Sequence, residues 1–504
     1  MKRTAYFLMA FCAWLCYGCN DFLKEEDKDQ LIPRTTEHYE AMMHQEAFMK
    51  VNFNYTSDLM TDDIEENERA ATIAKNAFKS LYTWQRNVEF DGAGEKTSQT
   101  NPWWGNLYND ILIANYVLEH IADAQGTESK RDYLLGEASF LRARAYLELI
   151  CLYAPNYEEA TASTTMGVPI RLDTGVKNTY TRNNIDQVYT QIESDLQKAI
   201  DYFEQSTETM SLWHPNTKAA QLLLSRMYLY KGEWDKVISL TTTLINSCPA
   251  GLWNLASYSN TPFVTTNNPE IFHTYGNCFA LIVEKDDGNP TWKNDIPKIY
   301  AGEGEDGIET VAYGVSNELL NSYWEGDCRK SLYIVSTTEG KDVPAKWHSQ
   351  YTSLGAYSYR LSEAYLNRAE AYAAKGMNKE ALADVRELLE HRVKDISKVS
   401  FPSESGEVRK FVLDERRREF VGESHRWFDL KRTTSWYPKQ INHKFTLRST
   451  GTGGGSGVLQ GTETYLLAPN DPNYVFELPE AETTINTVIE TYGKRIEKIA
   501  IKVD

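Results

Sequence analysis

Apolar residues recur at intervals of three and four positions along much of this chain, a pattern that predicts amphipathic helices. Segment 359–392 shows it most clearly, because its small and apolar residues keep a helical period on both sides of Gly376. We interpret this segment as two antiparallel helices joined by a tight turn at Lys375-Gly376. The turn pattern has a counterpart earlier in the chain, where Tyr228, Lys231, Gly232 and Val237 stand at the same offsets as Tyr372, Lys375, Gly376 and Ala381.

Two helix hairpins with the same turn pattern predict a helical repeat of the tetratricopeptide kind. One hairpin cannot bury both of its faces, so such units stack on one another and form a solenoid. The alternative is two unrelated hairpins that happen to have similar turns.

The helical period covers most of residues 36–245 and 359–432, which we expect to form the main part of the scaffold of a mainly α protein. Between 246 and 350 the period largely disappears, and Gly, Pro, Asn and aromatic residues dominate. An irregular stretch of this length in a compact domain is usually functional. We therefore interpret 246–350 as a loop-rich insertion that contributes to a ligand-binding face.

The N-terminus has the features of a bacterial export signal. Lys2 and Arg3 precede an uncharged apolar run, which is too short to span a bilayer comfortably. The run ends in Cys16-Tyr17-Gly18-Cys19, which resembles a lipobox. We expect residues 1–18 to be a lipoprotein signal peptide and Cys19 to be the lipidated first residue of a mature domain, 19–504. Signal cleavage without lipidation is the alternative. No later segment is apolar enough to be a transmembrane helix.

Charge and motifs exclude several classes of function. The net charge of −18 argues against a nucleic-acid partner, which would need clustered Lys and Arg. The chain contains no H-E-x-x-H, G-x-S-x-G or P-loop motif, and its nine His residues show no paired metal-ligand spacing. We therefore expect no cofactor, no metal and no catalytic residue. The acidic loop 302–307 could hold calcium, but it lacks the EF-hand ligand pattern.

Segment 414–432 interleaves acidic residues, arginines and aromatic residues in the run DERRREFVGESHRWFDLKR. A catalytic interpretation would require a carboxylate pair held at a cleft. Because the arginines nearly match the acids in number, we favour a structural interpretation, in which Arg–carboxylate pairs hold a helix end against the solenoid.

This segment resembles the C-terminal signature of the SusD/RagB family of outer-membrane nutrient-binding lipoproteins. Four further stretches are similar to that family: the helix marked by Trp104, Tyr108, Ile111 and Asn115; Glu137-Ala138-Ser139-Phe140-Leu141-Arg142-Ala143; Asp195-Leu196; and 359–371. The resemblance implies a SusD-like fold of four tetratricopeptide units with a loop-rich ligand face. It also implies a partner, a SusC-like TonB-dependent outer-membrane transporter, and a lipid-anchored, surface-exposed location.

Aromatic residues are the candidates for ligand contact, because a Trp or Tyr ring can stack on the apolar face of a sugar. The chain has 12 Trp and 31 Tyr. We expect Trp103 and Trp292, which lie in or beside irregular segments, to be stacking platforms. The secondary candidates are Trp84, Trp347 and Tyr351, with Asn289 as a partner for sugar hydroxyls.

The sequence therefore predicts a non-catalytic surface lipoprotein that binds an oligosaccharide or polysaccharide nutrient and delivers it to the transporter. Three alternatives stay open: a non-glycan nutrient such as peptide, a secreted helical glycosidase with its site in 246–350, and a tetratricopeptide adaptor that binds only protein.

Overall fold

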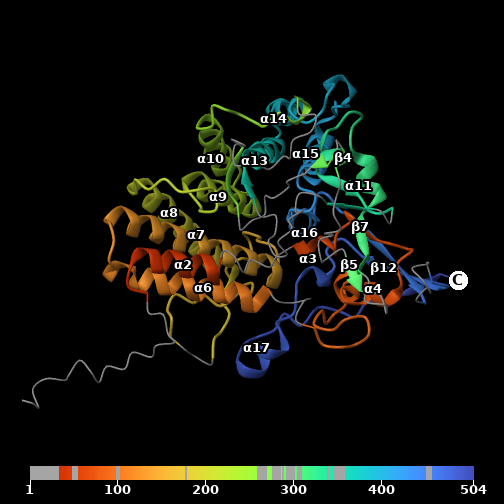
Figure 1. The fold of residues 1–504 in the computed structure, drawn as a ribbon, viewed down its shortest axis with the longest axis horizontal. Coiled ribbons are helices and arrows are strands. Elements are labelled where there is room, and N and C mark those ends of the chain that lie inside the picture. The colour runs from red at the N-terminus through yellow and green to blue at the C-terminus, as the bar shows by residue number, and fades with distance from the viewer. Residues whose placement is uncertain are drawn as a thin grey trace, which may run out of the picture.

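A computed structural model gives the fold (Figure 1). It describes residues 33–47, 55–97, 103–175, 179–257, 270–274, 285–286, 289–290, 301–303, 309–337, 340–344, 358–449 and 457–503. The predicted signal peptide, Cys19 and most of the acidic loop 302–307 lie outside these residues.

Helices packed side by side form one half of the molecule (Figure 1). In chain order they are α2 (Thr36–Glu46), α6 (Trp103–His120), α7 (Glu128–Tyr153), α8 (Ile185–Gln205), α9 (Thr217–Lys231) and α10 (Trp234–Asn246). Helix α7 lies between α6 and α8, and nearly all of its residues from Tyr133 onward are buried. Helix α8 begins with a capping box in which Asn184 and Gln187 satisfy each other's backbone N–H groups.

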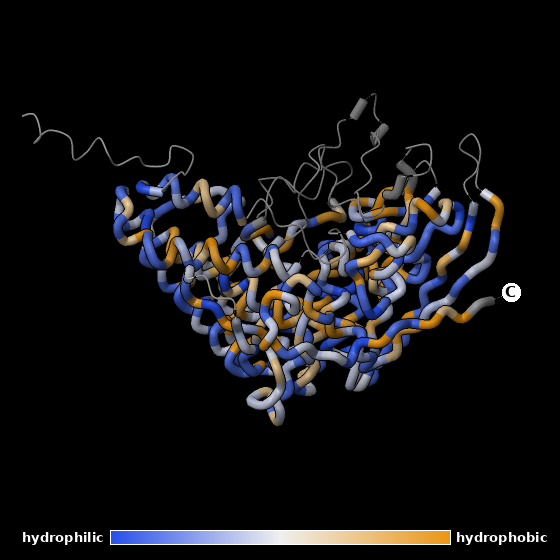
Figure 2. The backbone as a smooth tube through the Cα atoms, turned by 90° about the horizontal axis from the view of Figure 1, so that it is seen from below, coloured by the Kyte–Doolittle hydropathy of each residue, from blue (hydrophilic) through white to orange (hydrophobic). Residues whose placement is uncertain are grey.

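The second group of helices follows the irregular region: α13 (Leu361–Ala374), α14 (Asn378–Glu390), α15 (Ser405–Glu419) and α16 (His425–Arg432). Helix α10 packs on α13, so the two hairpins predicted from the sequence stack against each other. Along these helices hydrophobic and hydrophilic positions alternate (Figure 2). The expectation of a mainly α fold with stacked helix hairpins is confirmed.

The two hairpin turns have the same hydrogen bonds as well as the same sequence pattern. Gly232 and Gly376 both have a φ of +75°, which favours glycine. The amide N–H after each glycine donates to the carbonyl of the Tyr four residues before that glycine: Glu233 to Tyr228 at 3.0 Å, and Met377 to Tyr372 at 2.9 Å. Both turns are therefore Schellman motifs, which satisfy the last helix carbonyls and reverse the chain.

Short strands and helices form the other side of the molecule (Figure 1). The antiparallel pairs are β1 (Ile64–Glu66) with β7 (Tyr313–Val315), β2 (Ile271–Thr274) with β10 (Ser358–Arg360), β3 (Lys285–Asp286) with β4 (Asn289–Pro290), β5 (Ala301–Glu303) with β6 (Glu309–Val311), and β8 (Ile334–Ser336) with β9 (Asp342–Pro344). A three-stranded sheet joins β11 (Ile441–Arg448), β12 (Leu459–Leu467) and β13 (Ile501–Val503). The short helices are α3 (Tyr55–Asp58), α4 (Thr72–Asn76), α5 (Lys79–Tyr82), α11 (Asn317–Ser322), α12 (Arg329–Leu332) and α17 (Glu480–Ile485), with 3-10 turns at Ile121–Asp123, Leu255–Ser257, Ile396–Lys398 and Pro472–Tyr474.

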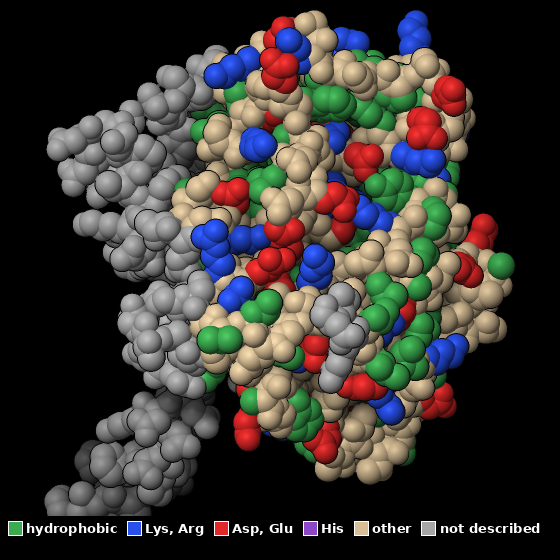
Figure 3. Space-filling model, turned by 90° about the vertical axis from the view of Figure 1, so that its right-hand side faces the viewer, with side chains coloured by type: hydrophobic (Ala, Val, Ile, Leu, Met, Phe, Trp, Pro, Cys, Tyr) green, Lys and Arg blue, Asp and Glu red, His purple; other side chains and the backbone are tan. Residues whose placement is uncertain are grey.

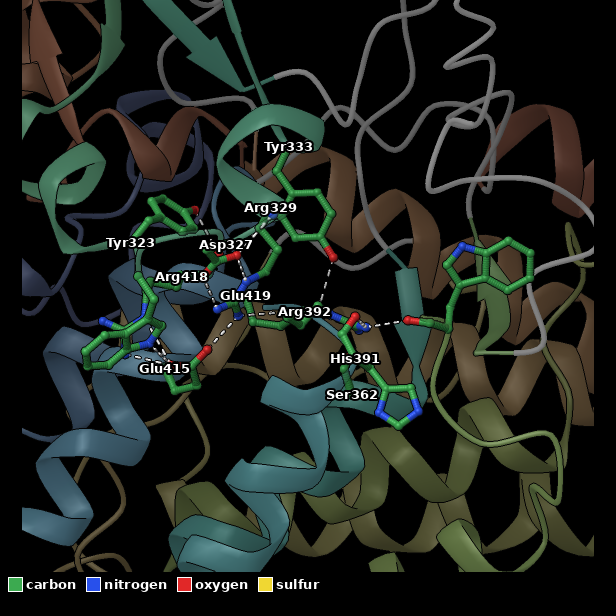
Figure 4. A network of polar contacts seen from close by, with 12 residues as sticks. Tyr323, Asp327, Arg329, Tyr333, Ser362, His391, Arg392, Glu415, Arg418 and Glu419 are labelled. Carbon is green, nitrogen blue, oxygen red and sulfur yellow. Dashed lines mark hydrogen bonds and ion pairs between the residues drawn. The ribbon is translucent and has the colours of Figure 1, made fainter. Parts of the chain in front are cut away.

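A buried network of charged side chains connects the two sides of the molecule (Figure 4). Arg392, two residues after the end of α14, lies 2.9 Å from Glu270 and 3.1 Å from Glu419 of α15. Arg329 of α12 lies 3.0 Å from the same Glu419. All four side chains have 0% exposure. The network supports the structural interpretation of segment 414–432, since its Glu419 helps attach the irregular region to the helical repeat.

Candidate functional site

An open cleft lies where β1, the start of α11, the β8–β9 turn and the start of β11 meet. Its volume is about 610 Å³, and its lining comprises residues 62, 64–69, 82, 316–318, 340–341 and 439–444. Acidic and basic side chains gather together on the face of the molecule turned toward the viewer in Figure 3, the side on which Figure 1 shows β7 and β12. A cleft of this size can hold a small ligand or a segment of a polymer.

Stacked aromatic rings support the wall of the cleft from behind. The imidazole of His443 lies between two rings, with its centroid 4.1 Å from that of Tyr82 and 4.3 Å from that of Trp84. Both of its ring nitrogens contact backbone carbonyls, those of Tyr82 at 2.6 Å and Thr61 at 2.9 Å. His443 is therefore held in place by contacts to both its ring faces and both its ring nitrogens.

Ion pairs occupy most of the acidic groups in the lining. Glu65 accepts from Lys341 at 2.6 Å and from the side-chain amide of Asn317 at 2.8 Å. Lys439 lies between two carboxylates, 2.6 Å from Asp62 and 2.5 Å from Glu318. These pairs fix the positions of Glu65, Asp62 and Glu318 in the lining.

Behind the lining, two guanidinium groups hold Asp62 in its ionised form. Arg426 contacts both carboxylate oxygens at 2.8 and 2.9 Å, and Arg417 lies 3.1 Å away. Burial raises the pKa of Asp62, but Arg417, Arg426 and Lys439 outweigh burial and hold this pKa well below its usual value. Similarly, burial raises the pKa of Glu318 while Arg417 and Lys439 lower it, with a net decrease.

Exposed polar side chains complete the lining. The amides of Gln440 and Asn442 lie at the start of β11, and Gln440 donates to Asn442 at 2.9 Å. Lys444 follows on the same exposed face of the strand, and Glu68 and Arg69 lie at the end of β1. Each amide offers both hydrogen-bond donors and an acceptor, which suits a ligand rich in hydroxyl groups.

The structure corrects two of the ligand contacts predicted from the sequence. Trp84 and Trp103 both have 0% exposure and belong to the hydrophobic core. Trp84 donates its indole N–H to the carbonyl of Met60 at 2.8 Å, and Trp103 packs edge-on against Phe476 with centroids 4.8 Å apart. Neither ring has a face on which a sugar could stack, so both are packing residues.

The other predicted ligand contacts remain predictions. Trp292, Trp347 and Tyr351 lie outside the described residues, as does the side chain of Asn289, whose backbone forms part of β4. The cleft residues 65–69 and 439–444 were not foreseen, because polar residues at strand ends carry no periodic signal.

Comparisons with known proteins identify the family. A family model described as "Starch-binding associating with outer membrane" matches residues 21–229, and the SusD family model matches 283–490. A SusD-like protein from Formosa agariphila is 23% identical, over 86% of this chain and 90% of its own length. Within the described residues, no helix is both long and apolar enough to span a membrane.

Solved structures share the fold. A putative sugar binding protein from Bacteroides vulgatus aligns with a TM-score of 0.65 and 20% identity, over 93% of this chain and 100% of that one. A laminarin-binding SusD-like protein aligns with a TM-score of 0.56 and 17% identity, over 91% and 99%. The fold is therefore that of the SusD superfamily structures, a helical-repeat scaffold that carries an irregular face, and the SusD-like fold class is confirmed. The two family models together match residues 21–229 and 283–490 of the chain. The chain belongs to the SusD/RagB family.

Proposed function

We propose that this protein binds an oligosaccharide or polysaccharide nutrient at the outer membrane, without cleaving it, and delivers it to a TonB-dependent transporter. The observation that carries the proposal is the polar cleft of a SusD-family scaffold, whose charges are paired with one another and whose exposed amides point to a hydroxyl-rich ligand. Two relatives support a glycan as ligand, since one solved neighbour is called laminarin-binding and another a putative sugar binding protein.

The cleft is better suited to binding than to hydrolysis. A glycosidase needs a general acid whose pKa lies near the working pH, together with a second carboxylate. In the cleft the pKa values of Asp62 and Glu318 are instead lowered by neighbouring cations, and Glu65 is paired with Lys341. Release of reducing sugar by the purified protein would favour the glycosidase alternative.

Stacking residues would complete such a site. We retain Trp292, Trp347 and Tyr351 as proposed platforms, with Asn289 as a hydroxyl partner. Hydrogen bonds to a sugar replace hydrogen bonds to water, so the net gain per contact is small and the expected affinity is in the micromolar to millimolar range, about −8 to −4 kcal/mol.

The test is calorimetry with a glycan first identified on a glycan array. Asn442→Ala and Gln440→Ala should each weaken binding by about 0.5–1.5 kcal/mol, the usual net contribution of a neutral hydrogen bond. Gln197→Ala is the matched control, because Gln197 is an exposed amide on α8 of the repeat. If the two cleft variants bind as tightly as the wild type, the glycan site lies elsewhere. If no glycan binds and a peptide does, the alternative nutrient is correct.

Delivery requires the transporter as a partner. Purification of the tagged lipoprotein in mild detergent should recover a large β-barrel protein, consistent with the family and the predicted lipid anchor. Recovery of the lipoprotein alone, under conditions that preserve a known complex of this kind, would contradict the proposed partnership.

A further inference from the structure

Three side chains that are distant in sequence meet at one edge of the helical repeat, away from the cleft. His44 comes from α2, Glu137 from α7, and His214 from the segment between α8 and α9. His44 and His214 are 170 residues apart in the chain, but α2 packs on α7 and brings His44 to Glu137, which His214 also contacts. No motif or spacing in the sequence indicates this cluster.

The three side chains present their ligand atoms to one another. His44 Nε2 lies 3.0 Å from His214 Nδ1, and Glu137 Oε1 lies 2.8 Å from His214 Nδ1 and 4.0 Å from His44 Nε2. In a tetrahedral zinc site with bonds of about 2.0–2.2 Å, the ligand atoms lie about 3.3–3.6 Å apart. The three atoms therefore already have nearly the separation that a shared ion would require.

The carboxylate of Glu137 supplies a second, independent observation. Its side chain has 0% exposure, and among the described residues its Oε2 has no hydrogen-bond partner. A buried carboxylate oxygen without a donor is costly to maintain. A cation bound beside Oε1 would compensate both oxygens of this group.

The surroundings also suit a cation. Glu40 Oε1 lies 3.6 Å from Nε2 of His214, the nitrogen that faces away from Glu137. This placement matches the outer carboxylate that commonly orients a metal-bound histidine. Lys130 pairs with the same Glu40 at 2.9 Å.

We propose that His44, Glu137 and His214 form a binding site for a divalent transition metal of the zinc class, with Glu40 orienting His214. Two imidazole nitrogens and one carboxylate are typical zinc ligands, whereas calcium and magnesium prefer oxygen ligands alone. The side chains of His44 and His214 are 20% and 13% exposed, so an ion has access from solvent. The bound metal ties α2 to α7 and to the segment before α9.

The proposal is tested with full-length lipoprotein that carries no polyhistidine tag and has been treated with a chelator. Titration with Zn2+ alone should show one ion per chain with a Kd in the micromolar range or below, and Zn2+ should raise the Tm. His44→Ala and Glu137→Gln should each weaken Zn2+ binding at least ten-fold and abolish the rise in Tm. His44→Ala keeps the fold, because alanine favours a helix and His44 is partly exposed.

His391→Ala is the matched control, since His391 lies 3.8 Å from Glu387, a His–Glu pair with no third ligand in the described residues. This variant should bind Zn2+ as the wild type does. Absence of stoichiometric Zn2+ binding in the wild type would overturn the proposal, as would equal binding in all variants. A loss of stability in His44→Ala that is independent of Zn2+, with no metal bound by the wild type, would show that the cluster is only a hydrogen-bonded contact.

Discussion

The indole ring of Trp84 stacks against the imidazole of His443 with centroids 4.3 Å apart and an interplanar angle of 23°. This contact places a residue of the irregular segment after α5 directly behind the wall of the polar cleft, because His443 lines that cleft. Trp84 thus supports the candidate site from the core instead of contacting a ligand.

Replacing Trp84 should therefore destabilise the protein. Trp84→Ala removes a fully buried ring and its hydrogen bond to Met60, and we expect it to reduce the free energy of unfolding by about 3–5 kcal/mol. Urea denaturation measures the change. Trp436→Ala, which removes a partly exposed indole, should cost clearly less. A Trp84→Ala variant with unchanged stability and weakened glycan binding would restore Trp84 as a stacking platform.

Substitution at the hairpin turn should act through the backbone alone. Gly376 has a φ of +75°, but a Cβ atom placed there would have no neighbour within 4 Å. The positive φ, and not a close approach of the two helices, therefore requires glycine at this position. We expect Gly376→Ala to cost about 1–2 kcal/mol and Gly376→Val about 1–3 kcal/mol, by chemical denaturation.

Gly105→Ala provides the matched control for the turn. Gly105 lies inside helix α6, is exposed, and also has no neighbour within 4 Å of a Cβ atom. Because Gly105 does not have a positive φ, Gly105→Ala should stabilise the protein by about 0.5–1 kcal/mol. If Gly376→Ala also stabilises the protein, the left-handed backbone conformation assigned to Gly376 is wrong.

Acid should weaken the attachment of α16 to α13. Glu370 accepts from both terminal nitrogens of Arg432 at 2.7 Å. Burial raises the pKa of Glu370, but Arg432, Arg409 and Arg416 lower it from 4.5 to about 2 overall. Because the folded-state pKa is depressed, the stabilisation is fully present above about pH 4.5 and is lost as the pH falls toward 2. At 1.36 kcal/mol per pKa unit it amounts to about 3 kcal/mol.

The measurement is urea denaturation of the wild type and Glu370→Gln between pH 7 and pH 2. The stability difference between the two should be large at pH 7 and should shrink below pH 4.5. Glu407→Gln is the control, because Glu407 forms an exposed pair with Lys410 that contributes little at any pH. A Glu370→Gln difference that stays constant down to pH 2 would contradict the assigned role of this ion pair.

Lipidation at Cys19 remains a prediction from the sequence. Growth with labelled palmitate should mark the wild-type protein and the Cys16→Ala variant, but not Cys19→Ala. Labelling that survives in Cys19→Ala would place the lipid elsewhere or show that the label reports a different modification.

Local features could be derived from the chain alone. The two Schellman turns follow from glycines placed at the same offset after a helical run, since both the period and the turn involve residues within a few positions of each other. The near match of acids and arginines in 414–432 likewise indicated a structural cluster. The partners in that cluster were not evident, because Glu270 lies far from Glu419 in sequence although both contact Arg392.

The burial of individual side chains could not be predicted in segments that lack a helical pattern of apolar residues. Trp84 lies in an irregular segment, which made it a secondary candidate for ligand contact. Its backbone carbonyl instead accepts from the buried side chain of Asn473 at 2.6 Å, and its indole N–H is also paired. Irregular backbone can be buried when its polar groups find such partners. The sequence therefore determined the helices, their turns and the family, which depend on neighbours along the chain. Tertiary structure alone decided which aromatic rings are buried, where the cleft opens, and that His44, Glu137 and His214 meet, because these depend on contacts between residues that are far apart in the chain.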